Sequence, residues 1–140
     1  MKHGMFIKRA TSMADIRAAE AAFDQEVIPQ AAQRFLDEPG HHILVAFDGE
    51  RGVGFISGVE TTHPDKGTEM FLYELGVVES HQGQGVGRSL IEALSTLARE
   101  CGCFGMWVLT ERTNRAAMAA YQAAGGTDAG DSVMIDWQFR

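Results

Sequence analysis

The sequence predicts a single α/β domain built around one central sheet. Segments with strand-like and helix-like hydrophobic periodicity follow one another in the order β-α-α-β-β-β-α-β-α-β, without internal repeats or linkers. The chain has 140 residues, of which 45% are hydrophobic and 22% charged, an ordinary globular composition at about the size of one domain. Disorder, a fibrous repeat and a disulfide-rich scaffold are thereby excluded, and we expect one domain over residues 1–140.

The first half of the chain carries capping and turn residues between its periodic segments. Ser12 can cap a helix whose apolar residues recur three or four apart. Pro39 and Gly40 follow a second helix, and Asp48-Gly49-Glu50-Arg51 joins two apolar segments in the manner of a β-hairpin. The expected elements are a strand over residues 5–10, helices over 13–23 and 30–36, strands over 42–47 and 52–59, and a loop over 61–68.

The second half contains the longest strand-like run, residues 70–78, whose almost continuous hydrophobicity indicates a strand covered on both faces. Only Glu74 and Gly76 interrupt this run. A glycine within a buried strand marks a β-bulge or a close approach of another backbone. The remaining expected elements are a helix from about residue 86 to 101 that Gly102 ends, a strand over 104–109, a helix over 114–124 and a last strand over 132–139 with Trp137 and Phe139 on one face.

The charge and the cysteines narrow the classes of partner. The 12 basic and 19 acidic residues give a formal net charge of −7, which repels a phosphate backbone or an anionic membrane and attracts cations, so we expect no nucleic acid or membrane among the partners. No apolar run approaches the ~20 residues that span a bilayer, and no signal-peptide core follows Met1, which predicts a soluble, cytoplasmic protein. Cys101 and Cys103 are too close for a usual disulfide or a zinc-binding pair, which predicts reduced thiols and no metal.

A glycine-rich turn, Gln82-Gly83-Gln84-Gly85-Val86-Gly87-Arg88, lies between the strand over 70–78 and the next helix. Several glycines let backbone N–H groups converge, and a helix N-terminus adds partial positive charge, so the turn suits a phosphate or pyrophosphate, with Arg88 adding charge. A dinucleotide fingerprint would need glycine or alanine in place of Arg88, and no glycine is followed by the lysine and hydroxyl residue of a P-loop. A purely structural strand-to-helix turn is the remaining alternative.

Two motifs resemble those of the GNAT superfamily of N-acetyltransferases. Gln82-x-x-Gly85-x-Gly87, after Leu75-Gly76-Val77-Val78, is similar to the superfamily's loop for the pyrophosphate of acyl-CoA, and Asn114, Ala117, Tyr121 and Gly125 resemble its second signature. The resemblance covers nearly the whole chain and implies a GNAT-like fold, with a central mixed, mostly antiparallel sheet of six to seven strands, a splay at the fourth and fifth strands, and about four flanking helices. It also implies acetyl-CoA as cosubstrate, held by Leu75, Gly76, Val77, Val78, Gln82, Gly83, Gln84, Gly85, Val86, Gly87, Arg88, Asn114, Ala117 and Tyr121.

Within the superfamily the chain is most similar to aminoglycoside 3-N-acetyltransferases of the gentamicin/fortimicin type. The similar segments are residues 71–77, 108–111 and 133–136. The chain departs from those enzymes at Gly126, where an aromatic residue is usual, and within residues 81–84, where Arg-Arg is frequent. The resemblance implies direct acetyl transfer to the 3-N amine of an aminoglycoside, and hence antibiotic resistance. It also implies a homodimer formed through strands near the C-terminus, to which Trp137 and Phe139 could contribute.

Acetyl transfer to an amine needs a base for the ammonium proton and an acid for the departing thiolate. Glu74, set in an apolar strand, is the candidate base because burial raises the pKa of a carboxyl, and a solvent-facing carboxylate is its alternative. Tyr121 is the candidate acid, since a phenol with a pKa of about 10 is protonated at neutral pH, and a core tyrosine is its alternative. A bulge at Gly76 would open the sheet, and the resemblance implies that a backbone N–H near Val77 or Val78 binds the thioester oxygen.

The other candidate residues lie in sequence patterns that are less specific for one function. Asn114 can cap its helix or hydrogen-bond the CoA arm. The residues expected to hold the cationic acceptor beside Glu74 are Glu111 first, then Asp136, Glu60 and Glu69. Two alternatives to aminoglycoside acetylation remain: acetylation of a protein N-terminus, a lysine or a small amine metabolite, and a non-catalytic acyl-CoA-binding regulatory module.

Overall fold

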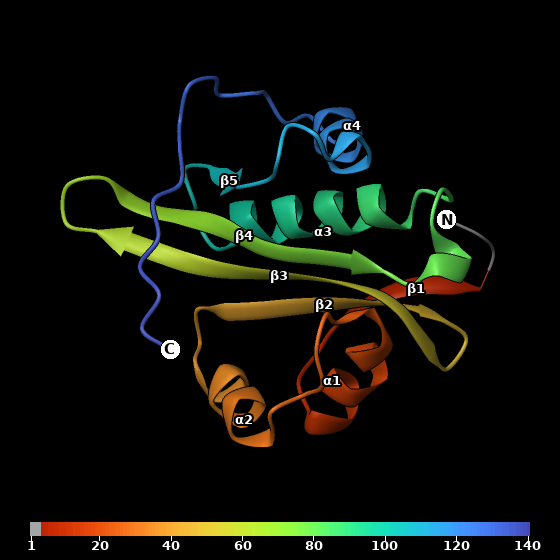
Figure 1. Cartoon of the computed structure of the whole chain (residues 1–140). Coiled ribbons are helices and arrows are strands. Elements are labelled where there is room, and N and C mark those ends of the chain that lie inside the picture. Colours follow the sequence, from red (N-terminus) through yellow and green to blue (C-terminus); the bar gives the residue numbers. More distant parts are fainter. Residues whose placement is uncertain (1–3) are drawn as a thin grey trace.

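The computed structural model describes residues 4–140 and shows a sheet with helices on both faces (Figure 1). The sheet has five strands, which lie side by side in chain order. Strands β1 to β4 are antiparallel to their neighbours, whereas β5 is parallel to β4, so the expected mixed, mostly antiparallel sheet is confirmed. The strands are β1 (Met5–Arg9), β2 (His41–Asp48), β3 (Arg51–His63), β4 (Gly67–Val77) and β5 (Met106–Val108).

The described residues also form four α-helices and two 3₁₀ turns, with α4 following the last strand. Helices α1 and α2 lie on one side of the sheet, and α3 and α4 lie on the other (Figure 1). The Ser12 hydroxyl caps α1 by accepting a hydrogen bond from the backbone N–H of Asp15, as expected. The helical elements are α1 (Met13–Ala19), η1 (Glu20–Ala22), α2 (Pro29–Asp37), η2 (Glu79–His81), α3 (Val86–Glu100) and α4 (Arg115–Ala123).

Two hydrophobic clusters hold the helices to the sheet. The cluster under α3 contains Leu44, Ala46, Val53, Ile56, Met70, Leu72, Val86, Leu90, Ile91, Leu94 and Ala98. The cluster under α1 contains Ala10, Ile16, Ala19, Ile43, Val45, Phe47 and Phe55. Successive residues of β2 from Ile43 to Phe47 belong to the two clusters in turn, as do Phe55 and Ile56 of β3, so these central strands are covered on both faces.

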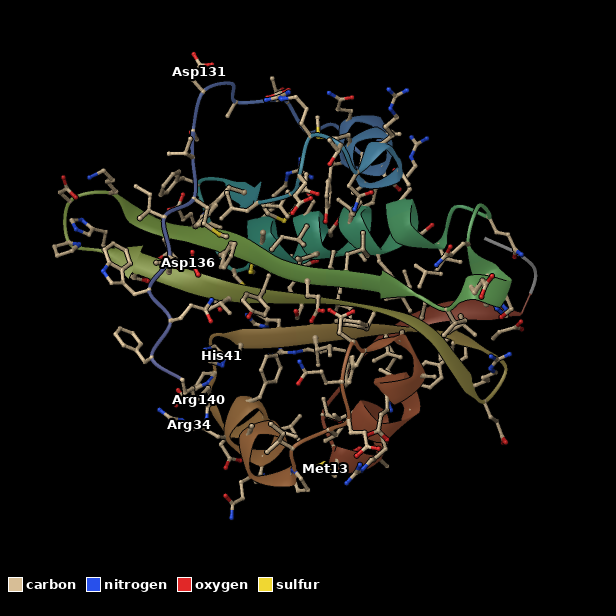
Figure 2. All side chains as sticks on the ribbon, in the orientation of Figure 1. Met13, Arg34, His41, Asp131, Asp136 and Arg140 are labelled. Atoms are coloured by element: carbon tan, nitrogen blue, oxygen red, sulfur yellow. The ribbon has the colours of Figure 1, made fainter. Side chains whose placement is uncertain are left out.

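The expected count of six to seven strands is wrong, because residues 132–139 form no strand. β5 offers an edge of only three residues, and the chain after it turns at once, with the N–H of Asn114 bonded to the carbonyl of Glu111. A segment with strand-like alternation then has no long edge to pair with. It instead runs from the α4 side of the sheet to the α2 side (Figure 1), and its apolar side chains are exposed, with Phe139 at 92%. Figure 2 shows the side chains of this segment, with Asp136 and Arg140 labelled.

Several element boundaries also differ from the expectation. The predicted loop over 61–68 is shorter, because β3 continues to His63 and β4 starts at Gly67. The first helix ends at Ala19 and continues as the short turn η1. Within residues 4–140 no helix combines the length and the apolar character that a membrane span requires.

Candidate active site

The edge of β4 is open beyond Leu72. β5 pairs with β4 only over Met70–Leu72, so among the described residues no strand covers that edge from residue 73 to 77, where the sequence predicts a splay. The N–H of Val78 is bonded to the carbonyl of Val53 on β3. Because consecutive N–H groups along a strand point to opposite edges, the N–H of Val77 faces the open edge. Of the two amides suggested by the sequence, Val77 is therefore the one free to meet a ligand there.

A β-bulge at Tyr73 turns Glu74 toward the α1 side of the sheet. Glu74 pairs with Ser57 and Leu72 pairs with Gly58, which leaves Tyr73 as the extra residue. Leu72 and Leu75 both pack toward α3. Strict alternation after Leu72 would send Glu74 into that core, so the bulge is what places its carboxyl on the opposite face.

Gly76 is not the bulged residue, although a bulge there was one expectation from the sequence. It pairs in register with Phe55. A Cβ at this position would come within 2.5 Å of the carbonyl oxygen of Ala22 and 2.7 Å of Cε1 of Phe55. The second expectation from the sequence, a close approach of another backbone, therefore accounts for this glycine. Without a side chain at Gly76, η1 can lie directly on β4.

A cleft of about 800 Å³ lies on this face of the sheet, between the segment that joins α1 to α2 and strands β3 and β4. Its polar lining includes the carboxyl groups of Glu74, Asp24 and Glu26 and the hydroxyl of Ser57. The remaining lining is mostly apolar and aromatic, from Ile16, Phe23, Val27, Ile28, Ala31, Ala32, Phe35, Ile43, Phe55, Phe71, Tyr73, Leu109 and Met134. The cleft therefore offers carboxyl groups in an apolar setting, which suits a cation attached to an apolar or partly apolar body.

Glu74 and Asp24 form a carboxyl pair in the cleft. Burial raises the pKa of Glu74, and the hydrogen bond and the negative charge of Asp24 raise it further. The negative charge of Asp24 disfavours ionisation of Glu74, so Glu74 binds a proton more readily than a free carboxyl does. The pair can accept a proton from an ammonium group and stabilise the positive charge of that group.

Asp24 was not among the residues predicted from the sequence, and packing of its neighbours places it. Phe23 packs edge-to-face on Phe55, with ring centroids 4.6 Å apart. The Glu20 carboxylate accepts a hydrogen bond of 2.8 Å from the N–H of Val27 and so closes the loop that contains Asp24. The only available sequence signal was the cluster of acidic residues just after the first helix, which is common on solvated surfaces.

The glycine-rich turn has the backbone conformation that its glycines permit. Gly83 and Gly85 have φ values of 73° and 83°, in the left-handed region that favours glycine, and Gly85 directly precedes α3. No atom lies within 4 Å of a Cβ built at either position, so the turn has an open surface. The unbonded N–H groups at the start of α3 give this surface a partial positive charge. The turn therefore fits the pyrophosphate of an acyl-CoA.

Buried and loop side chains brace this turn. His81 is buried, and its Nε2 lies 2.9 Å from a carboxylate oxygen of Asp48 at the β2–β3 hairpin. The amide of Gln82 donates a hydrogen bond to the carbonyl of Val77. Arg88, expected to add charge to the anion site, instead forms an exposed ion pair of 2.8 Å with Glu92 on the next turn of α3. Much of the anion-binding character thus comes from backbone groups rather than from this side chain.

The residues of the second motif lie on α4. The side chain of Asn114 accepts a hydrogen bond of 3.1 Å from the N–H of Ala117, so the helix-capping alternative holds for this residue. Tyr121 packs against the cluster under α3, and burial raises the pKa of its phenol, which is therefore protonated at neutral pH. A Cβ at Gly126 would lie 2.9 Å from the carbonyl oxygen of Tyr121, so the aromatic residue usual at this place does not fit here.

The other carboxylates named from the sequence lie away from this pair. Glu111 is exposed in the turn after β5, and Asp136 is exposed near the C-terminus and accepts a hydrogen bond from Gln138. Neither lines the cleft. Glu60 is bonded to His42 on the α3 face, and Glu69 is also outside the cleft. Among the acceptor candidates from the sequence, the structure brings only Glu74 into the cleft.

Comparison with known proteins finds similar sequences among acetyltransferases. The sequence pattern of the Acetyltransferase (GNAT) family matches residues 10–125. N-alpha-acetyltransferase RimI of Mycobacterium tuberculosis is 34% identical over 119 residues, which are 83% of this chain and 71% of that protein. N-acetyltransferase 8 of Rattus norvegicus is 27% identical over 101 residues. The matched part is 46% of the rat protein, so the chain spans about half the length of this relative.

Solved structures share the fold at low sequence identity. An aminoglycoside acetyltransferase from an uncultured soil metagenomic sample, in complex with trehalose, has a TM-score of 0.84 at 20% identity, over 98% of this chain and 97% of that one. AAC(6')-Iy, in complex with the bisubstrate analogue CoA-S-monomethyl-acetylneamine, has a TM-score of 0.82 at 18% identity, over 96% and 98%. The latter is named for the 6′ position, so the similarity does not single out the 3-N type. With the family pattern over residues 10–125 and a sheet opened at β4, the chain belongs to the GNAT family of acetyltransferases.

Proposed function

We propose that this protein transfers the acetyl group of acetyl-CoA to a primary amine of a cationic acceptor, by direct transfer in a ternary complex. The observation that carries the proposal is the position of Glu74. Glu74 lies in the part of β4 whose outer edge is not covered by β5. Its carboxyl lies beside Asp24 in the cleft, where the acceptor amine would bind. An amine held by this pair would lie beside the strand edge that fits the acetyl donor.

Acetyl-CoA supplies an activated acetyl thioester, and three groups of residues would hold it. The open edge of β4 over residues 75–78 would pair with the pantetheine arm, and the turn over residues 82–88 would bind the pyrophosphate. Asn114, Ala117 and Tyr121 on α4 would complete the site. The φ angles of Gly83 and Gly85 and the uncovered N–H of Val77 support this assignment.

The chain's own groups account for the proton and charge changes of the reaction. The carboxyl pair of Glu74 and Asp24 accepts the proton that an ammonium must lose before its nitrogen can form the new C–N bond. The N–H of Val77 donates a hydrogen bond to the carbonyl oxygen as negative charge develops there. Tyr121 keeps its proton at neutral pH and delivers it to the sulfur when the C–S bond breaks.

An aminoglycoside antibiotic is our first candidate acceptor. A net charge of −7 and the carboxyl pair favour a polycationic amine, and similar structures are described as aminoglycoside acetyltransferases. Acetylation at the 3-N position, and a role in antibiotic resistance, rest on the sequence likeness of residues 71–77 to that type of enzyme. NMR of the product distinguishes the 3-N position from the 6′ position.

The second candidate is the α-amine of a peptide with an apolar N-terminal residue. The specific observation is the aromatic and aliphatic lining, including Phe23, Phe35, Phe71 and Leu109, which would bury an apolar side chain beside the amine. A 34% identical relative is named an N-alpha-acetyltransferase.

The test is release of free thiol from acetyl-CoA in the presence of gentamicin-type aminoglycosides, polyamines and peptides with apolar or polar first residues. Turnover with an aminoglycoside supports the first candidate, and turnover confined to peptides replaces it with the second. Binding of acetyl-CoA without turnover on any amine would contradict the enzymatic proposal and favour a binding module. Glu74→Gln serves as the matched control, because the amide keeps the shape of the side chain and loses its basicity.

We also propose a cytoplasmic homodimer. The exposed apolar residues near the C-terminus, among them Trp137 at 73% and Phe139 at 92% exposed, support an interface at this end of the chain. Light scattering with Trp137→Ser and Phe139→Ser tests it. The expected result is a dimer that the substitutions convert to a monomer, and a parent protein that is monomeric at assay concentration would contradict the proposal.

A further inference from the structure

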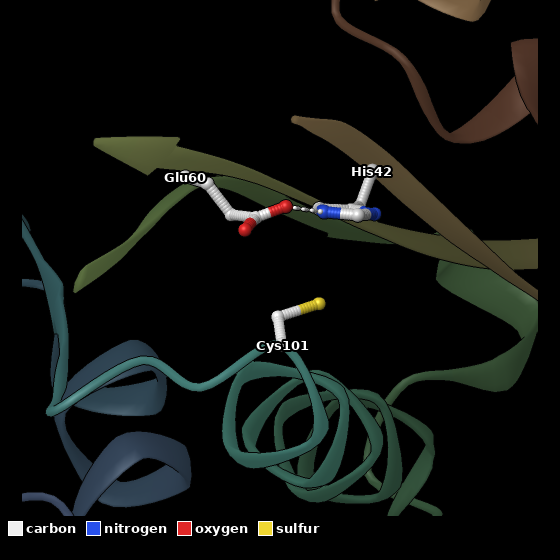
Figure 3. A group of neighbouring side chains, drawn as sticks. All are labelled: His42, Glu60 and Cys101. Atoms are coloured by element: carbon white, nitrogen blue, oxygen red, sulfur yellow. Dashed lines mark hydrogen bonds and ion pairs between the residues drawn. The ribbon is translucent and has the colours of Figure 1, made fainter. Parts of the chain in front are cut away.

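A second polar cluster lies on the other face of the sheet, far from the cleft. His42 comes from β2, Glu60 from β3, and Cys101 from the end of α3, at the opposite end of this helix from the glycine-rich turn (Figure 3). The three side chains point toward one another between the sheet and the helix (Figure 3). None of them has a role in the proposed acetyl transfer.

The ligand atoms of this cluster are close enough to share one ion. A nitrogen of His42, a carboxylate oxygen of Glu60 and Sγ of Cys101 all lie within 4.8 Å of one another. His42 Nε2 is 2.7 Å from Glu60 Oε2, which is a hydrogen bond with its proton in place. Ligand atoms around a tetrahedral zinc ion, each about 2.0–2.3 Å from the metal, are separated by distances in the same range. Small side-chain shifts would therefore suffice to bind a metal.

The imidazole of His42 makes fewer hydrogen bonds than its two ring nitrogens allow. Its side chain is 3% exposed, and Nδ1 is buried with no hydrogen-bond partner among the described residues. A buried polar atom without a partner is costly, and this nitrogen has a free lone pair that can take up a proton. The hydrogen bond to Glu60 keeps the ring proton on Nε2, so metal binding at Nε2 requires this proton to move to the unpartnered Nδ1.

The path to the cluster and its chemistry also suit a cation. The Glu60 side chain is 24% exposed and Cys101 is partly buried, so an ion can enter from solvent. A purely structural His–Glu hydrogen bond would explain Nε2, but not the approach of Cys101 Sγ to both groups.

We infer that His42, Glu60 and Cys101 bind a divalent transition-metal ion of the zinc class. Imidazole, carboxylate and thiolate are all ligands that zinc accepts, whereas a thiolate disfavours magnesium and calcium. Binding displaces the thiol proton to solvent and forms the metal–sulfur bond, and the imidazole stays neutral. A water molecule from solvent would complete the four ligands.

No local pattern in the sequence indicates this site, because its ligands come from three elements. Cys101 and Cys103 alone lack the spacing of a zinc-binding pair. His42 and Glu60 meet only through the antiparallel pairing of β2 with β3, and the end of α3 then places Cys101 opposite them (Figure 3). The expectation of no metal thus followed from local spacing alone.

Titration of the full chain with Co²⁺, monitored by absorption, tests the inference. The expected result is one ion per chain, with the near-ultraviolet thiolate-to-cobalt charge-transfer band, displaced by Zn²⁺ and accompanied by a higher Tm. Cys101→Ser should abolish the band and weaken Zn²⁺ binding at least about tenfold, the lower end of what lost ligand support typically costs. Glu69→Gln, a carboxylate outside the ligand set, is the matched control and should bind like the parent.

Two results would overturn the assignment. One is the absence of a charge-transfer band from the folded parent protein at excess Co²⁺. The other is a band of unchanged intensity in Cys101→Ser, which would assign the sulfur ligand to Cys103. Circular dichroism of each variant confirms that it is folded. Because the readout is spectroscopic, the result does not depend on whether acetyl transfer is observed.

Discussion

Replacing Gly76 by alanine tests whether the contact between β4 and η1 builds the acceptor cleft. The added Cβ would lie 2.5 Å from the backbone carbonyl oxygen of Ala22 and 2.7 Å from the ring of Phe55. Because a backbone atom cannot rotate away, η1 must move as a unit. Phe23 and Asp24 directly follow η1, so the movement displaces one member of the carboxyl pair.

The expected loss of stability follows from the cost of overpacking a core, about 1–3 kcal/mol. An unfolding entropy of about 2.1 cal/mol/K per residue gives a chain of this size a slope of about 0.3 kcal/mol per degree, so Tm should fall by about 3–10 °C. Gly87→Ala is the matched control. Its Cβ would make only ordinary contacts, at 3.8 and 4.0 Å from Leu75 and Val77, and alanine favours a helix by up to about 1 kcal/mol.

Differential scanning calorimetry measures both variants, and steady-state kinetics measures their KM values. Gly76→Ala should raise the KM of the acceptor amine more than the KM of acetyl-CoA, since the movement is on the cleft side of β4. A Tm for Gly76→Ala equal to or above that of the parent would refute the reasoning, because it would mean that the chain relieves the contact without cost.

Three further predictions concern single side chains. The folded-state pKa of Glu74 is raised, so its contribution to stability is present below the unfolded pKa and is lost as the pH rises through the folded pKa. Glu74→Gln should therefore raise Tm relative to the parent at neutral pH, with a smaller difference in acid. Calorimetry across pH checks the sign of this difference. Tyr121→Phe should lower kcat by about ten- to a thousandfold and leave the affinity for acetyl-CoA unchanged. Single-turnover kinetics and calorimetric binding measure these two quantities, and an unchanged kcat would show that Tyr121 is not the acid. His81→Ala removes the contact with Asp48 that braces the glycine-rich turn, so the Kd for CoA should rise while acceptor binding is kept, and equal CoA affinity would show that the turn needs no brace.

Local periodicity predicted most elements up to residue 124, because each has its own hydrophobic face and its own end signals. The helix over 86–101 and the hairpin around Asp48 illustrate this, since their caps and turn residues lie next to them in sequence. The prediction of a last strand over residues 132–139 was wrong for the opposite reason. Its alternation is genuine, but a strand also needs an edge, and the length of β5 cannot be read from residues 132–139.

Only the part of the candidate site that has a local sequence signal was predictable. Glu74 interrupts an apolar strand, which is visible in the sequence, but its direction depends on a bulge at Tyr73 that only the pairing with β3 reveals. Asp24 becomes a partner of Glu74 through the packing of Phe23 on Phe55, a contact between residues 32 positions apart. Tertiary contacts of this kind leave no local pattern.

The pH dependence of kcat/KM, measured for the parent and for Glu74→Gln with the best amine from the panel, tests the central claim most directly. The account predicts that the activity of the parent falls on the acid side as the raised pKa of Glu74 is crossed, and that the variant loses this limb together with most of its activity. Identical profiles and rates for the two proteins would contradict the claim that this carboxyl pair accepts the proton of the acceptor amine.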